Sequence, residues 1–269
     1  MLILTATPRR PSSTPVMNLL HLQDTLSLSK IRDVLIRSED TIIFALIERA
    51  QFTHNPVIYR PAAFALNGYA GSFLSWFLLE TESVHAKVRR YTSPDEHPFS
   101  PPDALPAPIL AALDYPHVLH PNTININARV HDVYVQEIVP AIAAAGDDLN
   151  YGSAATRDID ALQALSRRIH YGKFVAEAKF GGPEHDKYVA LIKAQDRAAI
   201  LELLTDRDVE AKLLARLEKK AMAYGQDPES AETSKNYKVR PEVVRRVYEQ
   251  FVIPLTKVVE VEYLLRRLD

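Results

Sequence analysis

LSRRIHYGKFVAEAKF, residues 165–180, is the stretch that decides the fold class, because its residues recur at the three- and four-residue spacing of an α-helix. Five of them share one face: Leu165, Arg168, Gly172, Val175 and Lys179. Arg168 and Lys179 on that face are separated by about 16 Å of helix rise. A face with core-like spacing thus presents two cations, which predicts a binding place for an anion. The alternative is that both side chains lie along apolar surface and keep their charged ends in water.

The composition is that of an ordered, helix-rich protein. Of 269 residues, 47% are apolar and 25% are charged, while only 8 are glycine, well below the usual share of about 7%. This length is enough for one large core or two modest domains. The net charge of −2 argues against a nucleic-acid binder or a membrane-surface binder, which would show a basic excess. Any anion site must therefore be a local concentration of cations.

The cysteine count and the N-terminal segment bear on location. The chain contains no cysteine, which excludes disulfides, thiolate metal ligands and a cysteine nucleophile, and which favours a reducing, cytoplasmic compartment. No apolar run approaches the ~20 residues that a membrane span requires. Residues 1–26 are predicted to form a disordered or loosely ordered tail. Their start contains Arg and Ser but no acidic residue, so a transit peptide is the alternative.

Helical periodicity begins near Ser27 and continues, with proline-rich interruptions, to the C-terminus. The predicted helices are a long one from residue 27, one over residues 72–91, one over 127–146 interrupted at Pro140, the long one that contains residues 165–180 and is capped by Ser153 or Thr156, two or three over 183–224, and one over 241–268 bent at Pro254. Residues 93–108 contain too many prolines for a helix and predict a surface loop. No alternating strand pattern is present. We expect an all-α, single-domain bundle of about ten or more helices over residues 27–269.

Charges also interrupt the apolar faces of two other predicted helices. Arg32 lies in register with Leu35, Ile36 and Ile43 on the first helix. On the last helix the register contains Ile253, Thr256, Glu260 and Leu264. Each charge taken alone is explained by an exposed or ion-paired side chain, but their recurrence on three helices predicts a shared pocket.

Other chemistries have little support in the sequence. It contains no P-loop, no dinucleotide-binding glycine pattern after a strand and no zinc-protease motif. The nine histidines are scattered without a metal-ligand spacing. His170 is interpreted as a packed or surface histidine rather than a general base.

Four stretches together resemble the eukaryotic, fungal-type chorismate mutase. They are IRDVLIRSEDTIIFALIERAQF (residues 31–52), HAKVRRYTSPDEHPF (85–99), GSAATRDIDALQALSRRIHYGKFVAEAKF (152–180) and VIPLTKVVEVEYLLRRL (252–268). The resemblance runs in order from about residue 27 to the C-terminus and is weaker over 54–68 and 227–240. It implies an all-helical homodimer that isomerises chorismate to prephenate on the route to phenylalanine and tyrosine.

The resemblance implies a role for the cations in binding the substrate. Chorismate is a small dianion, and its rearrangement is pericyclic, so neither metal nor cofactor is required. An enzyme has to hold the near-attack conformer and stabilise the charge that develops on the ether oxygen. By resemblance, Arg32 and Arg168 bind the two carboxylates, for which guanidinium forks are suited. Lys179 and Glu260 would face the ether oxygen as the remaining catalytic residues.

Glu260 can help the reaction only when it is protonated, because an ionised carboxylate would repel the developing negative charge. Burial and the dianionic substrate should raise its pKa. Activity is then expected to fall as pH rises above that pKa.

Three further residues match substrate-binding positions: Glu210, Thr256 and Asp206. Glu210 would hold the substrate hydroxyl, and its alternative is an exposed glutamate paired with a basic residue. Asp206 stands where the family is expected to have asparagine, which leaves its role open.

The resemblance also implies regulation by amino acids at the dimer interface, with tyrosine inhibiting and tryptophan activating. The matching residues are Arg89, Arg90, Asn150, Gly152, Ser153 and Thr156. A helix N-terminus suits an effector carboxylate, whereas Arg89 and Arg90 are equally well explained as a basic helix end. Arg240 departs from the expected small threonine, so the effector response is less secure than the activity.

Two other functions compete with this interpretation. One is a catalytically silent helical dimer that serves as an effector-binding regulatory module. The other is a helical lyase acting on a related aromatic-pathway acid. The complete set of four catalytic residues argues against the silent module.

Overall fold

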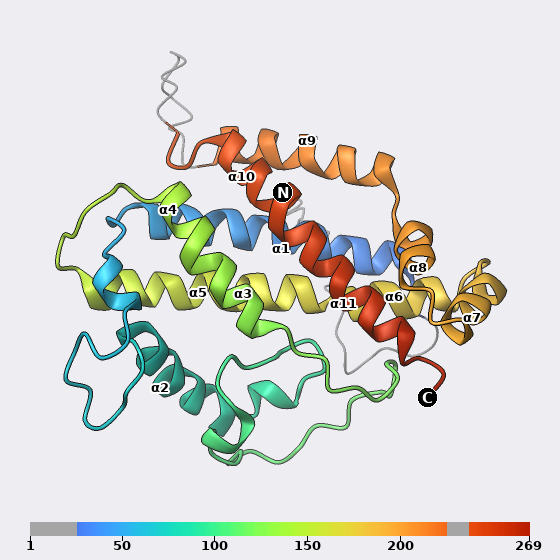
Figure 1. Ribbon diagram of the computed structural model, residues 1–269, viewed down its shortest axis with the longest axis horizontal. Helices are drawn as coiled ribbons and strands as arrows, with labels where there is room; N and C mark the ends of the chain where they lie inside the picture. Colours follow the sequence, from blue (N-terminus) through green and yellow to red (C-terminus); the bar gives the residue numbers. More distant parts are fainter. Residues whose placement is uncertain (1–25, 225–236) are drawn as a thin grey trace, which may run out of the picture.

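The protein is all helical in the part that the structure, a computed structural model, describes: residues 26–224 and 237–269 (Figure 1). The α-helices are α1 (Leu28–Ala50), α2 (Phe73–Lys87), α3 (Asn127–Val133), α4 (Val139–Ile142), α5 (Tyr151–His170), α6 (Gly172–Phe180), α7 (His185–Lys193), α8 (Arg197–Leu204), α9 (Arg207–Ala223), α10 (Pro241–Val247) and α11 (Ile253–Leu265). Short 3-10 turns occupy Pro56–Tyr59, Arg90–Thr92 and Pro102–Ala104. The predicted N-terminal tail lies outside the described residues, apart from Leu26.

The all-α prediction is confirmed, although the number of helices is slightly smaller than expected when segments that join end to end are counted as one rod. α3 joins α4, α5 joins α6 and α10 joins α11 end to end, so the eleven segments in the described ranges form eight rods. α1 and α5 run side by side, α6 continues the line of α5, and α11 crosses this layer (Figure 1). α9 and α2 lie along opposite edges (Figure 1). One apolar core, which includes Leu46, Leu162 and Val259, extends between these rods.

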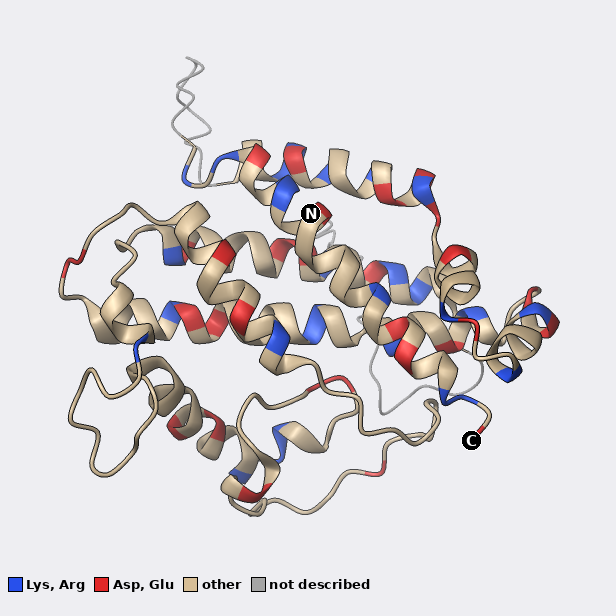
Figure 2. Ribbon diagram, viewed as in Figure 1, with Lys and Arg blue, Asp and Glu red and all other residues tan. Residues whose placement is uncertain are grey.

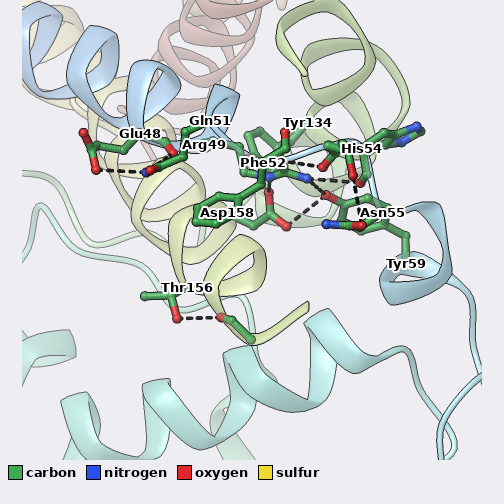
Figure 3. Close-up of polar contacts among 12 residues, drawn as sticks. Glu48, Arg49, Gln51, Phe52, His54, Asn55, Tyr59, Tyr134, Thr156 and Asp158 are labelled. Atoms are coloured by element: carbon green, nitrogen blue, oxygen red, sulfur yellow. Dashed lines mark hydrogen bonds and ion pairs between the residues drawn. The ribbon is translucent and has the colours of Figure 1, made fainter. Parts of the chain in front are cut away.

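A buried ion pair joins α1 to α5. Arg49 Nε donates to Asp158 Oδ1 at 2.6 Å, and both side chains are fully buried. Asp158 also accepts hydrogen bonds from the hydroxyls of Tyr59 and Tyr134 at 2.9 and 2.8 Å, and Arg49 donates to the carbonyl of Phe52 (Figure 3). Because the polar atoms of the pair are satisfied, removing one partner would leave an uncompensated buried charge, which costs roughly 3–5 kcal/mol. The register of the two longest helices is fixed by this contact.

Two prolines follow π-helical turns. The π segments are Tyr134–Ile138, before Pro140, and Tyr248–Val252, before Pro254. A proline lacks the N–H donor and its ring clashes with the carbonyl four residues earlier in a regular helix. The wider π turn moves that carbonyl aside, so both rods continue past their proline. Neither proline therefore ends its rod.

The described helices begin in different ways. Ser72 precedes α2, and its hydroxyl accepts from the Ser75 N–H at 3.1 Å, as an N-cap should. The predicted caps Ser153 and Thr156 are wrong, because α5 already begins at Tyr151, with Asn150 before it. Thr156 instead donates back to the carbonyl of Gly152 (Figure 3).

The charged residues of both signs are interspersed along the helices rather than gathered on one face (Figure 2). Among the described residues, no helix combines the length and the apolar character needed to cross a membrane.

Candidate active site

A cavity of about 440 Å³ opens between α1, α5, α6, α9 and α11. It is lined by all seven residues that the sequence singled out for catalysis or substrate binding: Arg32, Arg168, Lys179, Asp206, Glu210, Thr256 and Glu260. These residues come from segments up to 228 positions apart, and the fold gathers them in one place. Six cationic side chains and four carboxyl groups line the cavity. The chain therefore concentrates positive charge here although its net charge is negative.

Arg168 is a buried cation that lacks a carboxylate partner among the described residues. Arg168 is only 5% exposed and lies in the last turn of α5. Nη1 donates a long hydrogen bond of 3.4 Å to Thr256 Oγ1, while Nε has no hydrogen-bond partner. Burying an unpaired guanidinium is unfavourable unless an anion forms an ion pair with it. The cavity is consequently suited to an anionic ligand.

Glu260 lies in the same cavity on α11 and is 6% exposed. Burial raises the pKa of its carboxyl to about 7, in the expected direction, and the nearby cations Lys179 and Arg168 oppose that rise. Near neutral pH the group exists in both protonation states, so it can donate a hydrogen bond when protonated. A buried carboxyl group with a pKa near 7, beside a buried guanidinium that lacks a carboxylate partner, is typical of an active site.

The close packing of α6 on α11 places Glu260 and Thr256 in the cavity. A Cβ atom added to Gly172 would come within 3.0 Å of Thr256 Cγ2 and the Thr256 carbonyl, and within 3.1 Å of Glu260 Cγ. Only glycine therefore fits without a shift of α11. Gly172 also lies between Arg168 and Lys179 along the chain, directly after the break at Tyr171.

Lys179 and Asp206 lie where the α8–α9 corner meets α6. Lys179 Nζ donates to the carbonyl of Leu204 at 2.5 Å, which holds the ammonium at the wall of the cavity. Asp206 caps α9, since its carboxylate accepts from the Val209 N–H at 3.0 Å. Asparagine and aspartate cap helices about equally well. The departure from the expected asparagine therefore preserves this local structure.

The remaining predicted residues differ in how they are held. Glu210, in the first turn of α9, forms an ion pair of 2.8 Å with Lys257 on α11. Arg32 on α1 is exposed and has no hydrogen bond or ion pair with any described residue. Its guanidinium is thus available at the edge of the cavity.

Four polar residues that line the cavity were not predicted from the sequence: Glu39, Lys212, Arg216 and Lys257. Glu39 is 1% exposed and accepts from Arg216 Nη2 at 2.6 Å, with Lys220 at 3.1 Å. The sequence contained a signal for Glu39, which follows Arg32 by seven residues and so lies on the same helix face. The charges of α9 gave no comparable signal because that helix is polar on most of its surface.

A second cavity of about 510 Å³ adjoins the first. It shares four lining residues with it: Leu28, Lys179, Leu204 and Asp206. Lys179 therefore stands between the two spaces.

The candidate effector residues fall into two separate groups within the chain. Arg89 donates to the carbonyl of Ala111, and Arg90 contacts Glu96 and donates to Gln163 Oε1 at 2.9 Å. The other group is exposed at the start of α5: Asn150, Gly152, Ser153 and Thr156. Gln163 lies about 16 Å along α5 from Gly152. One chain therefore does not bring the two groups together.

Arg240 precedes α10 and is exposed. It forms no ion pair with a residue in the described ranges, so the pairing that a long cation could make at this position is not seen there.

The fold and the cavity define an all-helical protein with a cation-rich cavity suited to a small anion. The sequence model of the family "Chorismate mutase type II" matches residues 150–261. A chorismate mutase from Emericella nidulans is 52% identical over 251 residues, which cover 90% of this chain and 93% of that protein. The chain belongs to the chorismate mutase family and is an isomerase.

Solved structures agree with this assignment. The chorismate mutase from Candida albicans, crystallised in complex with L-Trp, is 47% identical and superposes with a TM-score of 0.86 over 90% of this chain and 92% of that chain. AtCM1, with tyrosine bound in its allosteric site, is 48% identical to this chain. It superposes with a TM-score of 0.83 over 92% of this chain and 99% of that chain.

Proposed function

We propose that the cavity between α1, α5, α6, α9 and α11 is the site at which chorismate rearranges to prephenate. The observation that supports this most directly is the juxtaposition, in one cavity, of the incompletely bonded Arg168 and the protonatable Glu260. The reaction breaks the ether C–O bond and forms a C–C bond within one molecule. The protein therefore has to orient and stabilise, not to supply a nucleophile.

The residues divide this work between them. Arg168, with Arg32 at the edge of the cavity, binds the carboxylates of the substrate and so fixes the two reacting ends near each other. Lys179 and protonated Glu260 donate hydrogen bonds toward the ether oxygen, where negative charge develops. Because these donors are already oriented before the reaction, little reorganisation accompanies the rearrangement.

Glu210 accepts the hydrogen bond of the substrate hydroxyl, and Thr256 contacts the substrate while also accepting from Arg168. Asp206 holds the start of α9 so that Glu210, one turn later, faces the cavity.

The loss of chorismate absorbance on adding purified protein tests the assignment, with Arg168→Ala beside it. Arg168→Ala should reduce kcat/KM by about a thousandfold, since a charged hydrogen-bonding group would be removed from the transition state. Arg167→Ala is the matched control, because Arg167 is the next residue along the chain and its guanidinium pairs with Asp95. A folded protein without chorismate turnover above the uncatalysed rate would favour the silent effector-binding module.

We also propose that the protein is a homodimer regulated by tyrosine, as inhibitor, and tryptophan, as activator. The support is twofold: the family members named above bind L-Trp, or tyrosine in an allosteric site, and the two groups of candidate residues are separated within one chain. A dimer in which Arg89 and Arg90 of one protomer meet the start of α5 of its partner would complete each site.

The cytoplasm is the compartment we propose, on the ground of the cysteine-free sequence. Relatives from Petunia hybrida and Arabidopsis thaliana are chloroplastic. Fractionation of cells that express the full chain with a C-terminal tag decides between cytoplasm and an organelle.

A further inference from the structure

We propose that Lys257 is a positioning residue of this reaction, which holds the Glu210 carboxylate in the orientation that receives the substrate hydroxyl. The proposal rests on the proposed function of the cavity.

The geometry of one ion pair supports this role. Lys257 Nζ lies 2.8 Å from Glu210 Oε1, and the two side chains are 22% and 28% exposed. Lys257 follows Thr256 on α11, while Glu210 belongs to the first turn of α9, so the pair joins two walls of the cavity. Neither side chain has another ion pair with a described residue.

A glutamate at this place would otherwise lose its orientation. Its side chain has several rotatable bonds, and fixing it without a partner costs conformational entropy. The ammonium of Lys257 occupies one lone-pair direction of the carboxylate. The remaining directions stay free to accept a hydroxyl hydrogen. Pairing therefore orients Glu210 without blocking it.

The same pair acts electrostatically on Glu260. The charged and titratable groups that face Glu260 are Arg168 from α5, Lys179 from α6, Tyr188 from α7, Glu210 from α9 and Lys257 from α11 itself. The positive charge of Lys257 lowers the pKa of Glu260, and the negative charge of Glu210 raises it. With Lys257 removed, one of the three cations that lower the pKa of Glu260 is lost while Glu210 remains, so Glu260 would keep its proton to higher pH.

The test compares Lys257→Met with Lys257→Arg. In Lys257→Met, KM for chorismate should rise roughly tenfold, with a smaller change in kcat, because the hydroxyl contact is loosened. The alkaline fall of activity should move upward by about half a pH unit or more. Lys257→Arg keeps the charge and should retain both properties. Lys187→Met is the control, because it removes a lysine of the surface pair with Glu184.

A double-mutant cycle separates action through Glu210 from direct substrate contact. In the Glu210→Gln background, Lys257→Met should change KM less than twofold, because the carboxylate it positions is already gone. Additive effects of the two substitutions on KM would overturn the proposal, as would an unchanged KM and pH profile in Lys257→Met. Both readouts compare folded proteins of equal helicity.

A measurement without turnover keeps this proposal distinct from the function of the cavity. Carbon-13 NMR of labelled glutamate in the free protein reports the pKa of Glu260 directly. Lys257→Met should raise that pKa whether or not chorismate is the substrate. An unchanged pKa would overturn the electrostatic part of the proposal, whereas absence of chorismate turnover in the wild type would overturn the proposed function instead.

Discussion

The Cα of Gly172 faces Thr256 so closely that an added Cβ would lie 3.0 Å from both the Thr256 methyl group and the Thr256 carbonyl oxygen. This is tighter than nine in ten contacts that real Cβ atoms make, and one of the two neighbours is backbone. The separation of α6 and α11 is therefore set by the absence of a side chain at one residue. That separation also sets the distance between Arg168 at the end of α5 and Glu260 on α11.

Gly172→Ala should move α11 outward by a few tenths of an ångström and displace Thr256 and Glu260. We expect kcat/KM to fall by about ten- to a hundredfold, because catalytic groups need placement to within about half an ångström. Alanine is also a better helix former than glycine, so stability should fall less than activity. Gly181→Ala at the end of the same helix is the control, since its nearest atom lies at an ordinary 3.6 Å.

Kinetics and thermal unfolding of both variants check this expectation. Equal activity in Gly172→Ala and Gly181→Ala would show that the spacing of α6 and α11 does not limit the reaction.

The pH profile depends on Glu260. Burial raises the pKa of this carboxyl to about 7 in the free protein, and a bound dianion should raise it further. Since the protonated form donates the hydrogen bond, activity should decline about tenfold per pH unit above the pKa of the complex. Glu260→Gln keeps a donor that cannot ionise, so its activity should stay level across the same range.

The measurement is kcat against pH from 5 to 9 for both proteins. A wild-type rate that stays flat to pH 9 would show that ionised Glu260 serves equally well, which contradicts the proposed role.

Hybrid dimers test whether the effector site is shared between protomers. Arg90→Ala and Gly152→Asp should each abolish the tyrosine response, the first by removing a cation and the second by repelling the effector carboxylate at the start of α5. Space exists for the aspartate, because no atom lies within 4 Å of a Cβ at Gly152. If the site is shared, a hybrid of the two variants contains one intact site and should recover part of the response.

Differently tagged chains, co-expressed and purified through both tags, provide that hybrid. Tyrosine inhibition is then measured beside the two parent homodimers. A hybrid as unresponsive as its parents would place the complete effector site within one chain.

The sequence predicted the helical class and the seven cavity residues for different reasons. Apolar spacing indicated the helices, because each helix buries one face, and charges in register with those faces singled out Arg32, Arg168, Lys179 and Glu260. Resemblance assigned their roles and added Asp206, Glu210 and Thr256. Spacing could not reveal the α6–α11 contact at Gly172, since closeness between residues 172 and 256 is a property of packing. The π turns were also missed, although YVQEIVP and YEQFVIP share a Tyr, a Gln and a Pro at the same intervals.

The contact between Lys257, which was not predicted, and Glu210, which was, shows the same limit. Glu210 belongs to α9, many of whose charged residues are exposed, whereas Lys257 is a partly buried residue of the largely apolar α11. Only the crossing of α9 and α11 brings them to 2.8 Å. Long-range electrostatic pairs of this kind cannot be identified from the periodicity of either helix.

His97 and His170 make the fold sensitive to acid. Their rings stack with centroids 4.2 Å apart, and His97 Nε2 lies 2.8 Å from the buried ammonium of Lys173. Burial lowers the pKa of His97 to about 2 and that of His170 to about 4. The unfolded chain, with histidine pKa values near 6.5, binds more protons than the folded one below that pH. The free energy of unfolding should therefore be fully present above pH 6.5 and decrease as pH falls below it, by roughly 1 kcal/mol per pH unit for each histidine.

His97→Gln should reduce this acid sensitivity, because its amide oxygen can still accept from Lys173 but cannot titrate. Urea unfolding at pH 7.5, 6 and 5 measures the free energy of unfolding for wild type, His97→Gln and the partly exposed control His131→Gln. The wild type and the control should lose stability in parallel between pH 6 and pH 5, while His97→Gln loses about half as much of the histidine-dependent part. A loss of the same size in all three proteins would assign acid unfolding to the carboxylates instead, and the two stacked rings would then have no share in it.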